Sequence, residues 1–365
     1  MQTSALTFYR FIAAAMVVIF HFGQDTFISS LAPGFFNSGP EMVTFFFVLS
    51  GFIMAMTSID QPQFTAARYW LNRFSKIYPA YLIAAVIMML FFGNKDSAHD
   101  STAILLHLTM LQSWVPNYPL TVNVPAWSLS IEAFFYALFP AILFFIKNKK
   151  PTAKQFFIFA ITLWLVTQII HVYLLNSARF YAQQDLIHFF VWYFPLSHLC
   201  SFVLGIAGYF LLTSKGSDSI ENQSSLTPLI ALIASLASIF LVLAFKADVS
   251  SAWGIQLPFE SSLLSPLFLL LILVTVYCDN AFTRFISLPF FIRLGEASYA
   301  VYILQKPIRS LYQMYIYPTI NTTLHIHLTS TIHFVAYFLL LVCISMWVTT
   351  RIEKPVKLLL RKTLS

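Results

Sequence analysis

Long apolar stretches separated by short polar segments run through most of the chain. Many of them approach the roughly 20 consecutive residues that an α-helix needs to cross the hydrocarbon core of a bilayer. Helices satisfy their own backbone hydrogen bonds in lipid, so this pattern predicts an all-α polytopic integral membrane protein with about ten spans. The predicted spans are 7–24, 41–58, 77–93, 124–146, 155–175, 186–213, 227–246, 258–278, 294–317 and 328–350.

The first of these stretches has one feature of a secretory signal, because Arg10 precedes an apolar run. A signal peptide also needs a cleavage site with small residues after that run. No such site follows Phe22 convincingly. We therefore predict a first helix that stays in the protein.

One apolar segment, 103–115 (AILLHLTMLQSWV), is too short for a span. Counting it as a span would place Lys147, Lys149 and Lys150 on the outer side of the membrane. We therefore predict a re-entrant or interfacial piece on the outer side. Non-helical backbone at that depth needs surrounding protein or water, so a cavity that faces outward is expected there.

The composition excludes a water-soluble fold. Hydrophobic residues make up 59% of the 365 residues and charged residues only 10%, and the mean hydropathy is +0.77. Soluble domains carry roughly 25% charged residues. One membrane domain is expected to fill residues 1–365, with the lipid bilayer as its surroundings.

The net charge of +7 does not indicate a nucleic-acid partner. Nucleic-acid binding needs basic residues gathered on one face that water reaches, whereas here they lie in alternate connecting segments. With a cytoplasmic N-terminus, the outer segments hold only Lys95, Arg179 and Lys246. The inner segments then hold Arg68, Arg73, Lys76, Lys147, Lys149, Lys150, Lys154, Lys215, Arg284, Arg293, Arg351, Lys354, Lys357, Arg361 and Lys362. This positive-inside bias predicts that both termini are cytoplasmic.

The three cysteines, Cys200, Cys278 and Cys343, all lie within apolar runs. They form neither a disulfide framework nor a CxxC metal pattern. Buried, unreactive thiols and no bound metal are therefore expected.

Charged side chains and histidines within spans are costly and usually mark a functional site or an internal pair. The candidates are Arg10, His21, Glu132, His198, Glu296, Lys306 and Arg309. Some of them also have a purely structural interpretation. Lys306 and Arg309 could pair with Glu296 for packing, and His198 could be a hydrogen-bonded core histidine.

Several motifs follow one another along the chain. Arg10 and His21 are eleven positions apart, about 16 Å and three turns on one helix, so they lie roughly on one face. The later motifs are FFFVLSGF at 45–52, RFSKIYP at 73–79, WSLSIE at 127–132 with FY at 135–136, and LGEASYAVY at 294–302. In this order they resemble the signatures of the membrane-bound acyltransferase-3 family, whose bacterial members O-acylate sugars of the cell surface.

The resemblance implies an acyltransferase of the bacterial inner membrane that uses acyl-CoA, acetyl-CoA being preferred, as a donor co-substrate. It implies site residues in the last two motifs, namely Trp127, Ser128, Ser130, Tyr136, Ser298 and Tyr299. Lys76 stands where the family often has Arg, and Gln305 stands where many members place a His. The chain ends at Ser365 without the SGNH-type esterase domain that some members append, so we expect the membrane domain to act alone or with a partner.

The residues themselves favour the same chemistry. Arg68, Arg73 and Lys76 surround the predicted cytoplasmic end of the third span, with Tyr78 and other aromatic residues between them. This arrangement suits the phosphates and the adenine ring of acyl-CoA. The alternative is that these residues only enforce topology or bind lipid headgroups.

A neutral imidazole can take a proton from a sugar hydroxyl as its oxygen attacks a thioester, so His21 is the predicted general base. Glu132 could orient His21 or hold the acceptor sugar, and otherwise it would only fix helix packing. Arg10 completes the predicted catalytic set. The carbohydrate acceptor and, as a candidate, the polysaccharide synthesis machinery are the expected partners.

Two other functions stay open on the sequence alone. A transporter or flippase of a glycan or lipid precursor would also have about ten spans, but it would commonly show two related halves. Residues 1–180 and 181–365 share no motif. An inactive scaffold in a polysaccharide synthesis complex is the second alternative. The Gln305 departure favours it, and the retention of Arg10, His21 and Glu132 argues against it.

Overall fold

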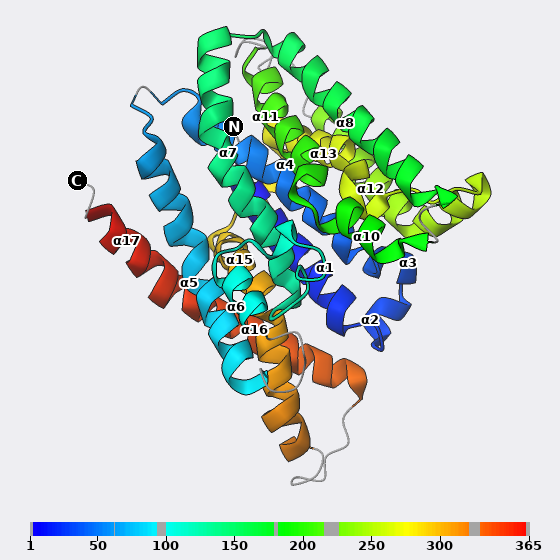
Figure 1. The fold of residues 1–365 in the computed structure, drawn as a ribbon, viewed down its shortest axis with the longest axis vertical. Helices are drawn as coiled ribbons and strands as arrows, with labels where there is room; N and C mark the ends of the chain where they lie inside the picture. Colours follow the sequence, from blue (N-terminus) through cyan, green and yellow to red (C-terminus); the bar gives the residue numbers. More distant parts are fainter. Residues whose placement is uncertain are drawn as a thin grey trace. The chain divides into compact units, whose positions relative to one another are not determined.

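The computed structural model describes residues 3–61, 63–92, 100–178, 182–214, 226–320 and 329–362, and within these ranges it contains no strand. The predicted all-α fold is confirmed. Lys95, Arg179 and Lys215, which entered the topology count, lie outside the described residues, as do the side chains of Arg361 and Lys362. The first α-helices are α1 (Ser4–Phe22), α2 (Phe27–Ser30), α3 (Pro33–Phe36), α4 (Gly39–Ser58), α5 (Ala66–Phe92), α6 (Ser101–Leu108), α7 (Trp127–Lys149) and α8 (Ala153–Leu175). They are followed by α10 (Gln184–His188), α11 (Leu199–Ser214), α12 (Leu226–Trp253), α13 (Ser265–Tyr277), α14 (Ala281–Phe285), α15 (Pro289–Leu311), α16 (Ser330–Val348) and α17 (Lys354–Lys362) (Figure 1).

Short 3-10 and π-helical segments connect or extend these helices. The 3-10 segments are η2 (Gln112–Trp114), η3 (Val124–Ala126) and η5 (Pro195–His198). The π-helical segments are η4 (Phe189–Tyr193), η7 (Phe259–Leu263), η8 (Tyr312–Ile316) and η10 (Thr349–Glu353).

Eight helices in the described part of the chain are long and apolar enough to cross a membrane. Their spans contain α1, α4, α5, α7, α8, α11, α12 and α16. The chain is therefore a multi-pass membrane protein. Two of the ten predicted spans fall on other helices. The first, α13, has only 13 residues, and the second, α15, has 23 residues but carries four charged side chains.

Within the predicted spans 186–213 and 258–278 the helix is interrupted. Pro195 begins a 3-10 turn that separates η4 from α11, because proline lacks the N–H that would continue the helix. In the second stretch the backbone is non-helical at Ser261 and Ser262, and α13 begins only at Ser265. Apolar composition alone does not reveal such breaks.

The third predicted span also differed at its start. It was expected at 77–93, whereas α5 begins at Ala66 and continues through Pro79. The additional turns carry Arg68, Arg73 and Lys76. Because these side chains are polar, the hydropathy pattern did not predict the first part of the helix.

The described chain groups into two compact units, each built from three separate parts of the sequence. The first unit consists of Met1–Tyr9, Pro40–Phe64 and Ile131–Ile292. Within it, α11 packs against α8 and against α13, and α12 packs against α13. A tight crossing joins α4 to α11, where a Cβ on Gly51 would meet the Phe202 carbonyl and a Cβ on Gly205 would meet the Val48 carbonyl. Small residues let helix backbones approach this closely in a membrane.

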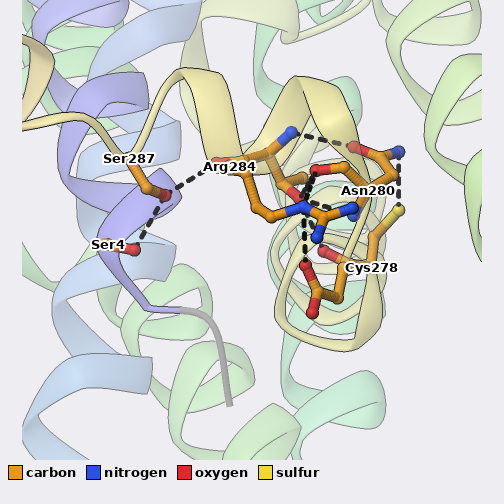
Figure 2. A network of polar contacts seen from close by, with 7 residues as sticks. Ser4, Cys278, Asn280, Arg284 and Ser287 are labelled. Carbon is orange, nitrogen blue, oxygen red and sulfur yellow. Dashed lines mark hydrogen bonds and ion pairs between the residues drawn. The ribbon is translucent and has the colours of Figure 1, made fainter.

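Figure 2 shows how the start of α1 is held in the first unit. The Ser4 hydroxyl donates a hydrogen bond of 2.8 Å to the Ser287 hydroxyl. Asn280 caps the N-terminus of α14 by accepting a bond from the Thr283 N–H at 2.8 Å. Arg284 lies on the same short helix and donates to the Asn280 carbonyl at 3.4 Å. These local bonds fix the segment that leads into α15.

The second unit consists of Arg10–Gly39, Thr65–Ser130 and Arg293–Ser365. In this unit α17 and η10 pack along α5, and α6 packs against the far part of α5 (Figure 1). The Tyr81 hydroxyl donates to the His107 carbonyl at 2.7 Å, and the Tyr78 hydroxyl donates to the Leu108 carbonyl at 3.1 Å. The C-terminal end of α6 is therefore tied to α5.

The predicted re-entrant segment is irregular, as expected. Its one α-helix, α6, has eight residues and is about 12 Å long, which is too short to cross a bilayer. Three non-glycine residues after it, Met110, Asn117 and Val122, adopt positive φ angles of 58°, 71° and 57°. This conformation is strained for a β-branched residue such as Val122, so the surrounding contacts must hold the segment in place.

The expectation for the cysteines was met for two of the three. Cys200 and Cys278 are buried, whereas Cys343 on α16 is exposed. Cys343 lies on a face of α16 that other parts of the chain leave uncovered. An apolar run therefore did not guarantee a buried thiol.

Candidate active site

His21 lies in the last turn of α1 and is half-buried. No described residue forms a hydrogen bond with either nitrogen of its imidazole, whose ring contacts are with Phe20 and Phe22. Lys306 of α15 acts on the imidazole electrostatically. Phe22 also contacts Tyr337 of α16, with ring centroids 5.8 Å apart. The imidazole thus stands next to α15 and α16 with both nitrogens available to a ligand.

Other histidines have ring nitrogens that are already engaged. In His198, Nε2 lies 2.9 Å from the Trp192 carbonyl and Nδ1 lies 3.3 Å from the Ser262 hydroxyl. The interpretation of His198 as a hydrogen-bonded core histidine is therefore confirmed. His171 Nδ1 contacts the Ser261 hydroxyl at 3.3 Å, and His333 Nδ1 contacts the Tyr312 hydroxyl at 2.9 Å. Unlike these three histidines, His21 has both ring nitrogens unbonded to described residues, which makes it a better candidate for chemistry than they are.

The part of α15 next to His21 contains a proline inside the helix, and another residue replaces the missing donor. Pro307 has no N–H, so it cannot donate to the Ile303 carbonyl one turn before it. The Asn123 side chain donates to that carbonyl instead, at 3.0 Å. This bond joins the segment before α7 to α15 and fixes which way the Asn123 amide faces.

Gln305 and Tyr337 form hydrogen bonds in the same part of α15. The Gln305 amide donates to the Tyr302 carbonyl at 2.7 Å, and the Tyr337 hydroxyl donates to the Gln305 carbonyl at 2.9 Å. The side-chain N–H groups of Asn123 and Gln305 are used in these bonds. Asn123 Oδ1 and Gln305 Oε1 therefore face away from the bonded carbonyls. Both oxygens are buried and accept no hydrogen bond from the described residues. An unmet buried acceptor costs about 1–3 kcal/mol, so these two atoms suit the hydroxyl groups of a ligand.

The WSLSIE motif contributes one side chain to this region. The Ser128 and Tyr302 hydroxyls are 2.8 Å apart, and this contact joins α7 to α15. Ser130 instead donates to the Met110 carbonyl at 2.6 Å. The Trp127 carbonyl accepts a bond from Ser113 at 2.8 Å. Ser130 and Trp127 therefore fix the irregular segment to the start of α7.

The two site residues predicted in the LGEASYAVY motif also have structural partners. The Ser298 hydroxyl donates to the Gly295 carbonyl of its own helix at 2.7 Å. The Tyr299 hydroxyl donates to the Ile77 carbonyl of α5 at 2.5 Å. Both side chains are buried. They position α15 within its unit.

Glu132 is half-buried in α7 and accepts two hydrogen bonds within the first unit. One comes from Tyr136, one turn further along the helix, and the other comes from the Ser50 hydroxyl of α4 at 3.3 Å. The predicted association of Glu132 with Tyr136 is thus present. Ser50, which stands in the LSGF part of the second motif, is a partner that the sequence did not reveal.

A second group of charged residues surrounds Glu353, at the end of η10. This carboxylate is only 6% exposed and interacts electrostatically with Lys76 of α5, Arg10 of α1 and Lys354. Arg10 itself is half-buried and forms no hydrogen bond or ion pair of its own with the described residues. Glu353 therefore draws two predicted site residues, Arg10 and Lys76, into one cluster.

The other predicted acyl-CoA contacts lie along α5. Arg73 is half-buried, with its guanidinium carbon 5.5 Å from the centroid of the Tyr69 ring. Lys76 is three residues further and on the same face. Arg68 is exposed. Tyr78 stacks on Phe74, with ring centroids 4.4 Å apart. Because its hydroxyl holds α6, Tyr78 has a structural role in this region.

The proposed pairing of Glu296 with Lys306 and Arg309 was wrong. Glu296 forms an ion pair of 2.8 Å with Lys354 of α17. It lies ten positions before Lys306, about 15 Å along α15, which is too far for contact. Lys306 and Arg309 therefore do not serve to pair with Glu296.

The residues that the sequence did not single out share one property. Asn123, Glu353, Tyr302 and Tyr337 contact partners that are distant in the sequence. The buried Glu353 at the end of the last apolar run offered a signal, since a carboxylate there needs a partner. Among the described residues no group of three or more His, Cys, Asp or Glu side chains could hold a metal ion.

Comparisons with known proteins identify relatives along most of the chain. A family model with the description "Acyltransferase domain" matches residues 4–350. The exopolysaccharide production protein ExoZ of Rhizobium meliloti is 26% identical over 276 residues, which are 73% of this chain and 76% of ExoZ.

Two other relatives match over a smaller part of their own length. The acyltransferase MdmB of Streptomyces mycarofaciens is 32% identical over 148 residues, which are 37% of this chain and 38% of MdmB. The O-acetyltransferase OatA of Staphylococcus aureus is 21% identical over 319 residues, which are 82% of this chain and 49% of OatA. The chain thus spans less than half the length of these two relatives. No solved structure matches it.

Proposed function

The chain belongs to the acyltransferase-3 family. We propose that it transfers an acyl group, namely acetyl, from cytoplasmic acyl-CoA to a carbohydrate hydroxyl. The acceptor is a cell-surface or lipid-linked glycan, and the protein works in the bacterial inner membrane. The names of two relatives, an O-acetyltransferase and an exopolysaccharide production protein, support this choice of acceptor chemistry.

The observation that carries the proposal is the state of His21. Its imidazole is half-buried, and neither ring nitrogen is bonded to a described residue. A histidine within a membrane helix is costly, and without such a bond it contributes little to the stability of the fold. A role in proton transfer accounts for its presence.

The proposed reaction uses this imidazole twice. One ring nitrogen of His21 accepts the proton of the acceptor hydroxyl as the hydroxyl oxygen forms a bond to the thioester carbonyl carbon. The carbon–sulfur bond then breaks, and the imidazolium returns the proton to the departing thiolate, so the products are the sugar ester and free CoA. Lys306, beside the ring, would stabilise the negative charge that develops on the carbonyl oxygen.

The cluster around Glu353 suits the donor's phosphates. Arg10 and His21 belong to one helix and are eleven residues apart, which is about 16 Å along its axis. A phosphate held near Arg10 and Lys76 would therefore leave the pantetheine arm about this distance to reach the imidazole. Arg73, on the same face of α5 as Lys76, would add a further cationic contact. In this proposal the donor phosphates bind at the Arg10 end of α1, and acyl transfer takes place at the His21 end.

The test is acyl transfer per folded molecule in purified protein. His21→Ala and His21→Gln should each lower it by about 10²-fold or more, because general-base catalysis contributes roughly that much. The amount of monodisperse protein in detergent should stay near that of the wild type. His188→Gln, which removes another half-buried histidine, is the control and should keep its activity. Near-normal transfer by either His21 variant would exclude His21 from the mechanism.

A deletion strain would identify the acceptor. The mass of each surface glycan is compared with and without the gene, and the proposal requires one glycan to lose the mass of one acyl group. Restoration by the wild-type chain but not by His21→Ala would link that loss to transfer itself. A transporter or a scaffold would instead be indicated if His21→Ala restored the acyl group fully.

A further inference from the structure

Arg309, near the C-terminal end of α15, is a half-buried cation with unused donors. Its Nε and Nη1 atoms are buried and form no hydrogen bond with any described residue. The guanidinium carbon lies 5.3 Å from the centroid of the Tyr337 ring and 5.9 Å from that of Tyr312. Aromatic faces attract a guanidinium, but they accept none of its N–H bonds in the plane of the group.

The described residues supply no counter-ion to Arg309. Arg309 takes part in none of the ion pairs that the described residues form. Glu296, the acidic residue of the same helix, lies thirteen positions away, about 20 Å along the axis, and is already paired with Lys354. Two buried donors without acceptors are costly, so Arg309 is expected to receive its partner from a ligand.

The position of Arg309 relates it to the site of chemistry. Lys306 lies three residues earlier, so the two side chains share one face of α15 about 5–6 Å apart at their Cβ atoms. Lys306 acts electrostatically on His21, and the ring of Tyr337 contacts both Arg309 and Phe22. An anion bound to Arg309 would therefore lie in the same part of the structure as the His21 imidazole.

The acyl donor does not supply this anion in the proposed reaction. Its phosphates are assigned to the Arg10 end of α1, and the pantetheine arm and thioester that reach His21 are uncharged. The acceptor must therefore bring the negative charge. Gln305 Oε1 and Asn123 Oδ1 are buried acceptors in the same region that suit neighbouring hydroxyl groups.

We propose that Arg309 binds an anionic group on the acceptor, so that the acceptor is an acidic sugar carrying a carboxylate or a phosphate near the acylated hydroxyl. This inference rests on the proposed function and specifies its substrate class. The planar guanidinium can bind either oxyanion through two parallel hydrogen bonds. Arg309 would thereby determine acceptor specificity without taking part in the bond changes.

The test compares three acceptors that differ only at C6: methyl β-D-glucoside, methyl β-D-glucuronide and methyl β-D-glucoside 6-phosphate. Purified protein receives acetyl-CoA, and the release of free CoA is followed for each acceptor. We expect kcat/KM to be about ten- to a hundredfold higher for at least one of the two anionic acceptors, as a charge-assisted contact predicts. The favoured compound distinguishes a carboxylate from a phosphate.

Variants identify the residue responsible. Arg309→Gln should remove the preference by lowering kcat/KM for the favoured anionic acceptor to about that for the neutral glucoside, and Arg309→Lys should retain part of it. Arg293→Gln is the control, because it removes the same charge from an exposed position of the same helix. Equal use of all three acceptors by the wild type, or an unchanged preference in Arg309→Gln, would overturn the proposal.

A second measurement separates this inference from the proposed function. The thermal stability of each protein is recorded with the three sugars and without acetyl-CoA. Stabilisation by an anionic sugar in the wild type and in Arg293→Gln, lost in Arg309→Gln, supports the anion subsite even if no transfer occurs. Transfer without any anion-dependent stabilisation or preference would leave the acyltransferase function standing and refute the subsite.

Discussion

Glu132 shows how a single carboxylate can serve either chemistry or packing. It accepts hydrogen bonds from Tyr136 and from Ser50, so it already joins α7 to α4. Glutamine has the same shape and keeps one oxygen acceptor for these hydroxyls, but it has no charge. The Glu132→Gln variant therefore separates the two roles.

We predict that Glu132→Gln lowers acyl transfer per folded molecule about tenfold or more, while the yield and thermal stability of the protein stay near the wild-type values. The reason is that a precisely placed charge aids orientation of the reacting groups, which packing alone does not need. Tyr136→Phe is the control that removes one hydrogen bond and retains the charge. Full activity of Glu132→Gln would assign the residue to helix packing.

Arg73 provides the corresponding test at the donor end. Arg73→Ala should weaken acyl-CoA binding by about 1.5–3 kcal/mol, or about ten- to a hundredfold in Kd, because a charge-assisted phosphate contact is lost. Isothermal titration of purified protein with CoA measures this change. Lys149→Ala, an exposed basic residue on α7, should leave Kd unaltered. If the two variants bound CoA equally well, Arg73 would serve topology only.

Residues that share one helix were the easiest to predict. Arg10 and His21 are eleven positions apart on α1, so helix geometry alone related them. Asn123 and Glu353 were missed because their partners come from other helices, far along the chain. Arg309 was recognised as a charged residue within a predicted span, but its aromatic contacts with Tyr312 and Tyr337 needed the three-dimensional arrangement.

At the level of elements, the crossing of α4 and α11 has no room for side chains. A Cβ added at Gly51 or at Gly205 would collide with a backbone carbonyl of the other helix. Backbone atoms cannot rotate away as the end of a long side chain can. The two helices would have to separate along their contact.

We predict that Gly51→Ala and Gly205→Ala each destabilise the protein by about 1–3 kcal/mol, the usual cost of overpacking. The double variant should cost less than the sum, because the first substitution already opens the shared crossing. Thermal unfolding in detergent gives both values. Ala234→Val, which adds bulk at an exposed position of α12, should have little effect. Full stability of both glycine variants would contradict the close crossing.

Helix type could be predicted from the sequence more reliably than helix ends. The long apolar runs gave α1, α4 and α8 nearly as predicted. Hydropathy misplaced the start of α5, whose first turns are polar and pack beside α17. It also missed the breaks at Pro195 and at Ser262. There side chains bind backbone carbonyls instead, because the Ser261 hydroxyl donates to the Val191 carbonyl and the Trp164 indole donates to the Ser262 carbonyl.

For the whole molecule, the distribution of basic residues predicts the orientation in the membrane. Asn117 should face the outside and Lys149 the cytoplasm, with the segment between α5 and α7 returning to the side it left. Both positions are exposed, so a cysteine at either one is open to labelling. The background needs Cys343→Ser, because Cys343 is exposed as well. A membrane-impermeant maleimide should label Asn117→Cys in intact spheroplasts and Lys149→Cys only after lysis. The reverse pattern would invert the topology.

The hydrogen bond from Asn123 to the Ile303 carbonyl also has a consequence for biogenesis. Its two residues are 180 positions apart, so the donor leaves the ribosome long before the acceptor. When α15 is synthesised, its proline exposes a carbonyl that lipid cannot satisfy, and the earlier segment is already available to cover it. We therefore expect α15 to dock against a segment that is already made, since the order of synthesis matches the order in which this bond can form.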